Sequence, residues 1–502
     1  MKALDLANKK VFSTVLKLTL PAMLAQFVSV LYSIVDRMYV GNIEGTGDIA
    51  LTALGVCAPM ATLLTSFGYL VGLGGAPLFA MSMGEGDMQK AKKILANALV
   101  MLVGLSVIAM AITFIFAKPL LMTFGASNAT YEYARQYLLI YTAGTLFSVV
   151  SVGLNQFIIA QGYSGIGMAT TLIGAVANIA LDPLFIFTFK MGVAGAALAT
   201  ILSQFVSFAF VIIFLFLKGT KCRLSFGGYD IKIMLKVIRM GISPFLIVAT
   251  DSIIIIASNI CLKAYGGENA DMWISSLTVV QAFLSIITMP MMGISTGSQP
   301  VISFNYGARN LDLIKKGEKC ILGMCVAFTT IMFGLSFVVA KPFVGLFTDN
   351  PVIAENSVWG IRIFMIGIIP LAFQYAFVDG MTALGQPQFA IVLSLTRKLV
   401  LYLGATLLLP KLLGAHAVFY AEPIADIGAA VLSTTVFLIF FPKILKKRAS
   451  TMPAANTSLN DTAILPDTDI SFNTTAKNTT KEMPFDTEED KNLRDDENSE
   501  NN

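Results

Sequence analysis

Twelve apolar runs before Arg448 limit the fold of this chain more than any other feature of its sequence. A helix of roughly 20 apolar residues crosses a bilayer core of about 30 Å. Because lipid offers no hydrogen-bond partners, the backbone of each run must satisfy itself, and we expect twelve transmembrane helices. The predicted spans cover residues 14–40, 51–82, 94–117, 131–159, 166–188, 193–217, 235–262, 273–304, 318–340, 357–383, 388–409 and 414–441.

The composition agrees with an all-α integral membrane protein. Of the 502 residues, 56% are hydrophobic and 13% are charged, whereas a soluble domain carries roughly a quarter charged residues. One His and five Cys leave no HExxH motif and no CxxC pair, and no glycine-rich nucleotide-binding motif is found. We therefore expect no enzyme activity, no structural metal, no cofactor and no nucleic-acid partner.

The Lys and Arg residues of the loops indicate the orientation of the chain. The side that holds the N-terminus carries 20 of them and the opposite side carries 5. Because Lys and Arg are retained in the cytoplasm, both termini are predicted to be cytoplasmic. We expect a multi-pass protein of the plasma (inner) membrane.

The end of the chain has a different composition. From Ala449 onward the chain contains 12 acidic and 4 basic residues, and such a segment buries too little apolar surface to fold. The predicted organisation is an N-terminal six-helix lobe at 1–217, a cytoplasmic linker at 218–236, a C-terminal six-helix lobe at 237–448 and a disordered acidic cytoplasmic tail at 449–502.

An internal repeat divides the spans into two sets of six. A shift of 223 residues, which becomes 222 after one deletion before Gly192, aligns matching Gly, Pro and Lys positions. The matches include Pro21 with Pro244, Gly84 with Gly307, Lys92-Lys93 with Lys315-Lys316, and Ala117-Lys118-Pro119 with Ala340-Lys341-Pro342. Six spans are an even number, so both halves enter the membrane from the same side. Such parallel repeats permit rocking around a central cavity.

The two halves differ in their acidic residues. Asp36 aligns with Asn259, and Asp182 falls opposite Gly404 or Ala405. This acidic pair therefore belongs to the N-terminal half alone.

Several motifs resemble one known family. Pro21 to Gln26 followed by the segment IVDRMYVG at 34–41 looks like helix 1 of the multidrug and toxic compound extrusion (MATE) family. The segments NIALDPLFIF at 178–187 and GVAGAALAT at 192–200 are similar to helices 5 and 6 of its DinF-like and MepA-like branch. Further C-terminal matches are Gln299-Pro300, Asn305 to Ala308, Arg397, Pro423 and Asp426, so the resemblance covers about residues 10–445.

This resemblance implies twelve helices in two lobes around a V-shaped cavity, and export of organic cations and drugs against entering Na⁺ or H⁺. It also implies roles for individual residues. A cation-coupling site maps onto Asp36, Asn178, Asp182 and Thr200; the substrate cavity onto Asn155, Met23 and Gln26; and a helix-1 hinge onto Pro21.

The residues themselves support a cation site. A carboxylate inside a membrane helix costs about 2.5–3.5 kcal/mol on insertion scales, so it is functional by default and has a partner. Asp182 precedes Pro183 and follows Asn178 by one helical turn. Two carboxylates in one dry pocket bind a proton or Na⁺. The alternatives are a salt bridge of Asp36 with Arg37, a solvated Asp36, and a helix cap by Asp182.

Four more acidic residues lie in the C-terminal spans. Asp251 and Asp379 are candidates for a second cation site, because another branch of the family uses carboxylates in that lobe. The alternative is that these acids line a cavity or pair with cations of the same lobe. The four acids are Asp251, Asp379, Glu422 and Asp426, and the cations are Arg362, Arg397 and Lys398.

We expect a secondary antiporter that exports amphipathic cations by alternating access, acting as a monomer in contact with membrane lipids. The alternative within the same superfamily is a flippase for lipids or lipid-linked saccharides, which requires a cationic cavity for phosphate. A channel or a receptor is a third possibility.

Overall fold

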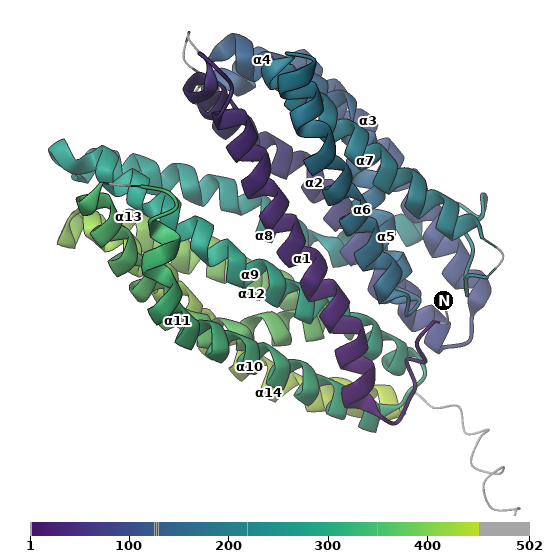
Figure 1. Cartoon of the computed structure of the whole chain (residues 1–502). Coiled ribbons are helices and arrows are strands. Elements are labelled where there is room, and N and C mark those ends of the chain that lie inside the picture. Colours follow the sequence, from purple (N-terminus) through teal and green to yellow (C-terminus); the bar gives the residue numbers. More distant parts are fainter. Residues whose placement is uncertain are drawn as a thin grey trace, which may run out of the picture. The chain divides into compact units, whose positions relative to one another are not determined.

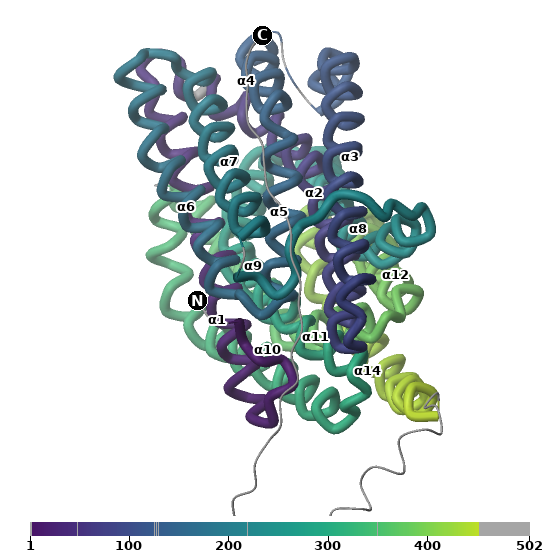
Figure 2. Tube along the Cα trace, turned by 90° about the vertical axis from the view of Figure 1, so that its right-hand side faces the viewer, coloured from purple at the N-terminus to yellow at the C-terminus, as the bar shows by residue number. Residues whose placement is uncertain are grey.

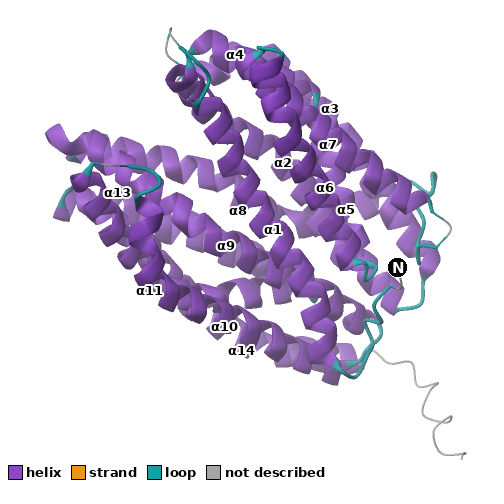
Figure 3. Ribbon diagram, in the orientation of Figure 1, coloured by secondary structure: helices purple, strands orange, loops and turns teal. Residues whose placement is uncertain are grey.

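Helices make up almost the whole of the part of the chain that the structure describes, and no strand occurs in that part (Figure 3). The structure is a computed structural model that describes residues 3–124, 126, 128, 130–217, 219–348 and 350–450. Most of the predicted acidic tail lies outside these residues. Ala449 and Ser450, which we assigned to the tail, form the end of the last helix.

The helices fall into two consecutive sets. The first set is α1 (Val11–Gly41), α2 (Gly47–Gly84), α3 (Met88–Thr123), α4 (Tyr131–Ala143), α5 (Thr145–Ala160), α6 (Ser164–Pro183), the π-helical η1 (Leu184–Thr188) and α7 (Gly192–Phe216). The second set is α8 (Ile231–Tyr265), η2 (Gly267–Asn269), α9 (Ala270–Gly307), α10 (Leu311–Val344), α11 (Pro351–Ala383), α12 (Pro387–Leu395), the π-helical η3 (Thr396–Leu403), α13 (Gly404–Leu413), η4 (Ala415–Ala417) and α14 (Val418–Ser450).

The predicted twelve spans are confirmed. Eleven helical segments of the described chain are long and apolar enough to cross a membrane, and α4 and α5 make the twelfth span as a pair bent by 52°. The bend falls at Gly144. Its repeat partner Gly367 lies inside the unbroken α11, so the two halves differ in the shape of their fourth span.

The internal repeat is visible in the helix boundaries. Both ends of α2 and α9 differ by 223 residues, and so do the starts of α3 and α10 and of α6 and α12. The turn that follows α2 has Gly86 at φ +79°, and the equivalent turn after α9 has Arg309 at φ +61°. A left-handed residue is costly unless it is glycine. The same turn is therefore kept in the second half even where the sequence no longer favours it.

Within residues 1–451, the two sets of helices lie close together at one end and diverge toward the ends that carry α4 and α13 (Figure 1). Helix α1 packs against α6 of its own set and α9 of the other set, and α2 packs against α5 and α8. On the outer side of the first set, α3, α5, α6 and α7 are neighbours (Figure 2). Helices α1 and α2 therefore connect the two halves.

The N-terminal segment also joins the halves. The backbone N–H of Leu4 donates to the carbonyl of Gly162 at 3.1 Å in the first half. Two residues later, Leu6 is 2% exposed and packs in the hydrophobic core of the second half. Its carbonyl accepts a hydrogen bond from the side-chain amide of Asn305 at 2.8 Å.

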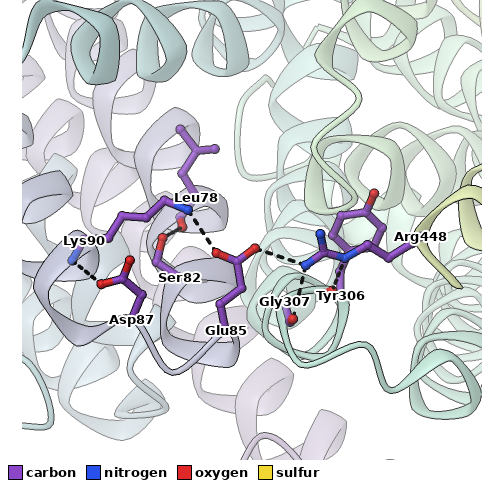
Figure 4. Close-up of polar contacts among 8 residues, drawn as sticks. All are labelled: Leu78, Ser82, Glu85, Asp87, Lys90, Tyr306, Gly307 and Arg448. Atoms are coloured by element: carbon purple, nitrogen blue, oxygen red, sulfur yellow. Dashed lines mark hydrogen bonds and ion pairs between the residues drawn. The ribbon is translucent and has the colours of Figure 1, made fainter. Parts of the chain in front are cut away.

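Arg448 makes the main polar contact between the halves at their close end (Figure 4). Its guanidinium donates to Glu85 Oε1 at 3.0 Å and to the carbonyls of Tyr306 and Gly307 at 3.0 and 3.2 Å. These carbonyls end helix α9, where backbone acceptors lack helical partners. Lys90 Nζ binds the other oxygen of Glu85 at 2.9 Å. One arginine therefore ties the ends of α2, α9 and α14 together.

The charge of Glu85 is stabilised by these contacts. Burial tends to raise the pKa of the Glu85 carboxyl, but the hydrogen bonds from Lys90 and Arg448 outweigh it and hold the pKa below its ordinary value of 4.5. A folded-state pKa below the unfolded value adds stability above pH 4.5, and this stability is lost as the pH falls through the lower folded-state value. The contact therefore remains charged at neutral pH.

We predict that Arg448→Ala lowers the stability of the purified protein by about 1.5–3 kcal/mol, because it removes charge-assisted hydrogen bonds and leaves Glu85 with one partner. Thermal unfolding in detergent measures this. The matched control is Arg135→Ala, which removes an exposed ion pair with Glu132 and should change stability by less than about 1 kcal/mol. Equal effects of the two substitutions would contradict the prediction.

A second measurement follows the charge of Glu85. The difference in the free energy of unfolding between wild type and Glu85→Gln should stay constant down to about pH 4.5 and shrink below that pH.

Candidate functional site

Asp36 on α1 and Asp182 on α6 meet between the two helices. Their carboxyl groups lie close enough to interact with each other electrostatically. Asp182 is fully buried, and its Oδ1 accepts a hydrogen bond from Asn178 Nδ2 at 3.2 Å. An ionised carboxylate is only an acceptor, so two carboxyls in contact require a proton or a cation between them.

Three oxygen atoms of this group have no hydrogen-bond partner although they are buried. They are Asp36 Oδ1, Asn178 Oδ1 and Asp182 Oδ2. Buried polar atoms are normally hydrogen-bonded, so each exception needs an explanation. Carboxylate and amide oxygens are also the ligands that hard cations prefer. The arrangement can therefore accept a proton or a small cation.

The other predicted member of the site takes a different position. Thr200 is half-buried on α7, and its hydroxyl donates to the carbonyl of Ala196 at 3.0 Å. Its hydroxyl is thus satisfied by its own helix, and within the described residues no hydrogen bond joins it to the two carboxyls. The alternative of a salt bridge between Asp36 and Arg37 does not occur among the described ion pairs, and Arg37 is exposed.

An irregular stretch of helix follows the buried Asp182. Pro183 lacks the N–H that would bond the carbonyl of Ile179, and the chain continues as the π-helix η1. Single π-turns inside helices are frequent at functional sites. Helix α7 packs closely on this turn, since a Cβ added at Gly195 would lie 2.7 Å from the carbonyl carbon of Phe185. The tight contact fixes the end of α6 that carries Asp182.

Two tyrosines near Asp36 were missed in the sequence. Tyr32 lies one turn before Asp36 on α1, and Tyr137 comes from α4; both interact electrostatically with the Asp36 carboxyl. Tyr137 stacks on Tyr141 with ring centroids 6.0 Å apart. The spacing of four residues between Tyr32 and Asp36 predicts that they are neighbours on one helix face. Tyr137 reaches the site only through the tertiary structure.

Pro21, the predicted hinge, lies inside an unbroken α1. Proline has no N–H, so the carbonyl of Lys17 one turn earlier loses its helical partner. The hydroxyl of Ser164 at the start of α6 donates to this carbonyl at 2.8 Å. Ser164 is 2% exposed. A buried hydroxyl of a neighbouring helix therefore replaces the hydrogen bond that the proline removes.

We predict that Ser164→Ala costs about 1–3 kcal/mol, because it leaves the partly buried Lys17 carbonyl without its partner. In Pro21→Ala the restored N–H can bond that carbonyl, so the cost of Ser164→Ala should largely disappear in the double variant. Thermal unfolding of the four proteins of this double-mutant cycle measures the coupling. Additive effects of the two substitutions would show that the Ser164 contact does not serve the proline.

A pocket that is partly open to solvent lies between the two halves, and its space, with the open part counted, is about 500 Å³. Residues of α2, α8, α9, α11 and η3 form its wall, among them Tyr69, Pro244, Met292, Tyr375, Asp379 and Arg397.

The residues that we assigned to the substrate cavity do not line this pocket. Asn155 donates to the carbonyl of Gly167 at 3.2 Å, Met23 packs on α9 next to Gly293, and Gln26 is half-buried on α1. Their role in a cavity stays a prediction.

The acids of the C-terminal half pair largely with cations. Arg397 on η3 donates from Nε to Asp426 Oδ1 at 2.9 Å, and its Nη2 lies 3.2 Å from Glu422 Oε1. Lys398 contacts Asp251. These three acids thus pair with cations of the same lobe, as the pairing alternative expected, and a cation site shared by Asp251 and Asp379 stays a prediction. Asp379 accepts a hydrogen bond from Ser295 and also interacts with Gln299.

Comparison with known proteins agrees with this architecture. The MatE family model matches twice, at residues 21–184 and 245–407. Two relatives, each called "Multidrug export protein MepA", are both 26% identical to the chain. The protein of Staphylococcus haemolyticus aligns over 437 residues, 86% of this chain and 94% of that protein. The protein of Staphylococcus aureus strain N315 aligns over 422 residues, which are 83% of this chain and 91% of that protein.

The fold is shared with a solved structure, described as the outward-facing conformation of a multidrug resistance MATE family transporter of the MOP superfamily. It matches with a TM-score of 0.81 and 23% sequence identity, and the alignment covers 89% of this chain and 99% of that one. Together with the double match to the family model, this shows that the chain belongs to the MatE family, the multidrug and toxic compound extrusion family that its motifs resemble.

Proposed function

We propose that the protein is a secondary active antiporter that exports organic cations, including drugs, in exchange for H⁺ or Na⁺. The observation that carries this proposal is the contact between the Asp36 and Asp182 carboxyls, with one buried oxygen of each left unpartnered. A pair of this kind requires a proton or cation to stay in a low-dielectric site. Binding and release of that ion is the property that a coupled exporter needs.

The substrate class follows from the pocket between the halves. Tyr69 and Tyr375 supply aromatic faces, and Asp379 supplies an acidic group. Aromatic rings and a carboxylate attract an amphipathic cation. The names of the relatives point the same way, since those proteins are called multidrug export proteins.

Alternating access is the mechanism that suits a chain of two like halves. In such a cycle the coupling ion and the substrate favour different conformations, and each must then weaken binding of the other by the same factor. Asp36 lies on the same helix as the Pro21–Ser164 contact, so ion binding at Asp36 and a bend of α1 at Pro21 act on one helix.

The remaining expectations are part of this proposal. The protein carries no cofactor other than its coupling ion, is not an enzyme and works as a monomer among membrane lipids. A flippase for lipids or lipid-linked saccharides is disfavoured because the cation in the pocket wall, Arg397, is balanced by Glu422 and Asp426. The pocket therefore lacks the free positive charge that a phosphate group requires.

We predict that Asp36→Asn and Asp182→Asn each reduce ion-driven export to the leak rate of empty liposomes, because the amide cannot take up the coupling ion. The assay is efflux of ethidium from proteoliposomes with an imposed pH or Na⁺ gradient, applied in turn. The matched control is Asn259→Ala, at the repeat position of Asp36, which should retain most of the wild-type rate. Normal coupled efflux by Asp182→Asn would overturn the proposal.

The proposed location is the plasma membrane with both termini in the cytoplasm, on the basis of the loop charges. We predict that a cysteine introduced at residue 449 is protected from an impermeant thiol reagent in intact cells and reacts after permeabilisation. A cysteine at residue 416, which the charge bias places in an outer loop, is the matched control and should react in intact cells. Labelling of residue 449 in intact cells would reverse the orientation.

A further inference from the structure

A buried carboxyl occupies a core position of the second half. Glu318 lies on α10 and is 4% exposed. The repeat shift of 223 residues pairs it with Leu95, which is fully buried in the hydrophobic core of the first half. Where one half places an apolar side chain in its core, the other half places an ionisable group. Such a substitution is costly in a membrane protein unless it has a use.

Both oxygen atoms of this carboxyl lack hydrogen-bond partners. The group lies directly against the backbone of α11, since a Cβ added at Gly380 would be 2.6 Å from Oε1 and 2.9 Å from Oε2. A buried charge without a partner is strongly disfavoured, and a buried carboxyl is therefore paired, neutralised or bound to an ion. The described protein groups around Glu318 supply no positive charge.

Asp379 of α11 is the titratable group from a neighbouring helix that interacts electrostatically with Glu318. On α10 itself, the buried Cys325 interacts with both acids, whereas Lys315, Lys316 and Lys319 are exposed. From α9, Ser295 and Gln299 contribute polar groups that bind Asp379 and carry no charge. From α1, Lys17 is exposed.

Asp379 connects this buried group to the pocket between the halves. Its side chain lines the pocket, while Glu318 lines neither that pocket nor the smaller one beside Gln299. The repeat partner of Asp379 is Gln156, so neither acid has an acidic counterpart in the first half. Each half thus places a buried acid near a half-buried one, at positions that the repeat does not relate.

We infer that Glu318 is a proton-binding site, and that its proton is linked through Asp379 to the binding of a cation in the pocket. A proton fits the geometry better than a metal ion does, because the carboxyl is packed on backbone without room for a coordination shell. The described residues also hold no cluster of three His, Cys, Asp or Glu side chains that would bind a metal.

The linkage has a definite sign. A cation in the pocket offsets the negative charge of Asp379, so it weakens the repulsion that keeps Glu318 from ionising, and the proton leaves Glu318 for bulk water. Conversely, a proton on Glu318 weakens cation binding by the same factor. This inference rests on the proposed function only for the identity of the cargo; the proton site itself stands on burial and packing.

The test uses the purified full-length protein in detergent at neutral pH, with ethidium as the cation. Infrared spectroscopy should show the carbonyl band of a protonated carboxylic acid that is absent in Glu318→Gln and that weakens when ethidium binds to the wild type. Ethidium should also release protons into a weakly buffered solution, and this release should disappear in Glu318→Gln. Wild type and variant with the same carbonyl band would overturn the inference, as would a band that ethidium leaves unchanged.

Two further variants keep the test decisive. Glu318→Leu restores the apolar residue of the first half, so it provides a folded comparison if the glutamine variant is unstable. Asp182→Asn should lose ion-driven efflux yet keep the Glu318 band. If the wild type shows no coupled efflux but shows the band and its response to ethidium, the proposed antiport fails and the proton site stands. If coupled efflux is present without the band, only the proton site fails.

Discussion

The fold depends on one constraint, which is that every backbone polar group inside lipid must find a partner within the protein. Long helices satisfy this requirement by themselves. Where a proline interrupts the helical hydrogen bonds, another residue or an irregular turn must satisfy the freed carbonyl. Pro21 frees the carbonyl of Lys17, and the hydroxyl of Ser164 binds it. Pro183 interrupts the hydrogen bonds of α6 next to Asp182, and the chain continues as a π-helix. The irregular points of the helices are thus the points where the predicted hinge and ion site lie.

The two halves share a scaffold but not the positions of their acidic residues. Helix boundaries and the turn at Gly86 and Arg309 repeat closely between the halves, because each half packs six helices within the same lipid bilayer. The acids do not repeat. The first half places the half-buried Asp36 beside the buried Asp182, and the second half places the buried Glu318 near the half-buried Asp379. Since a buried carboxyl stabilises nothing by itself, the presence of one in each half is what we explain by the two separate ion-binding roles proposed for Asp182 and Glu318.

The two halves are held together most tightly at one end. Arg448, Glu85 and the carbonyls at the end of α9 form the polar part of this junction, and Leu6 anchors the N-terminal segment in the second half. The pocket lies between the halves, and no residue of that junction contributes to its wall. For an alternating-access cycle, this end must separate, and charge-assisted hydrogen bonds at a partly exposed site can be broken and reformed at modest cost.

The sequence by itself determined the number of spans, their helical character, the tandem repeat, the family and the isolated position of the Asp36 and Asp182 pair, because hydropathy and Gly or Pro spacing are local or periodic signals. Asn178 and Asp182 were also readable, since residues four apart share a helix face. Only the tertiary structure decided that Ser164 binds the carbonyl that Pro21 leaves free, that Lys398 pairs with Asp251, and that Glu318 is a buried acid near Asp379. These contacts join helices far apart in the chain, and which helix faces meet depends on the packing of all twelve spans.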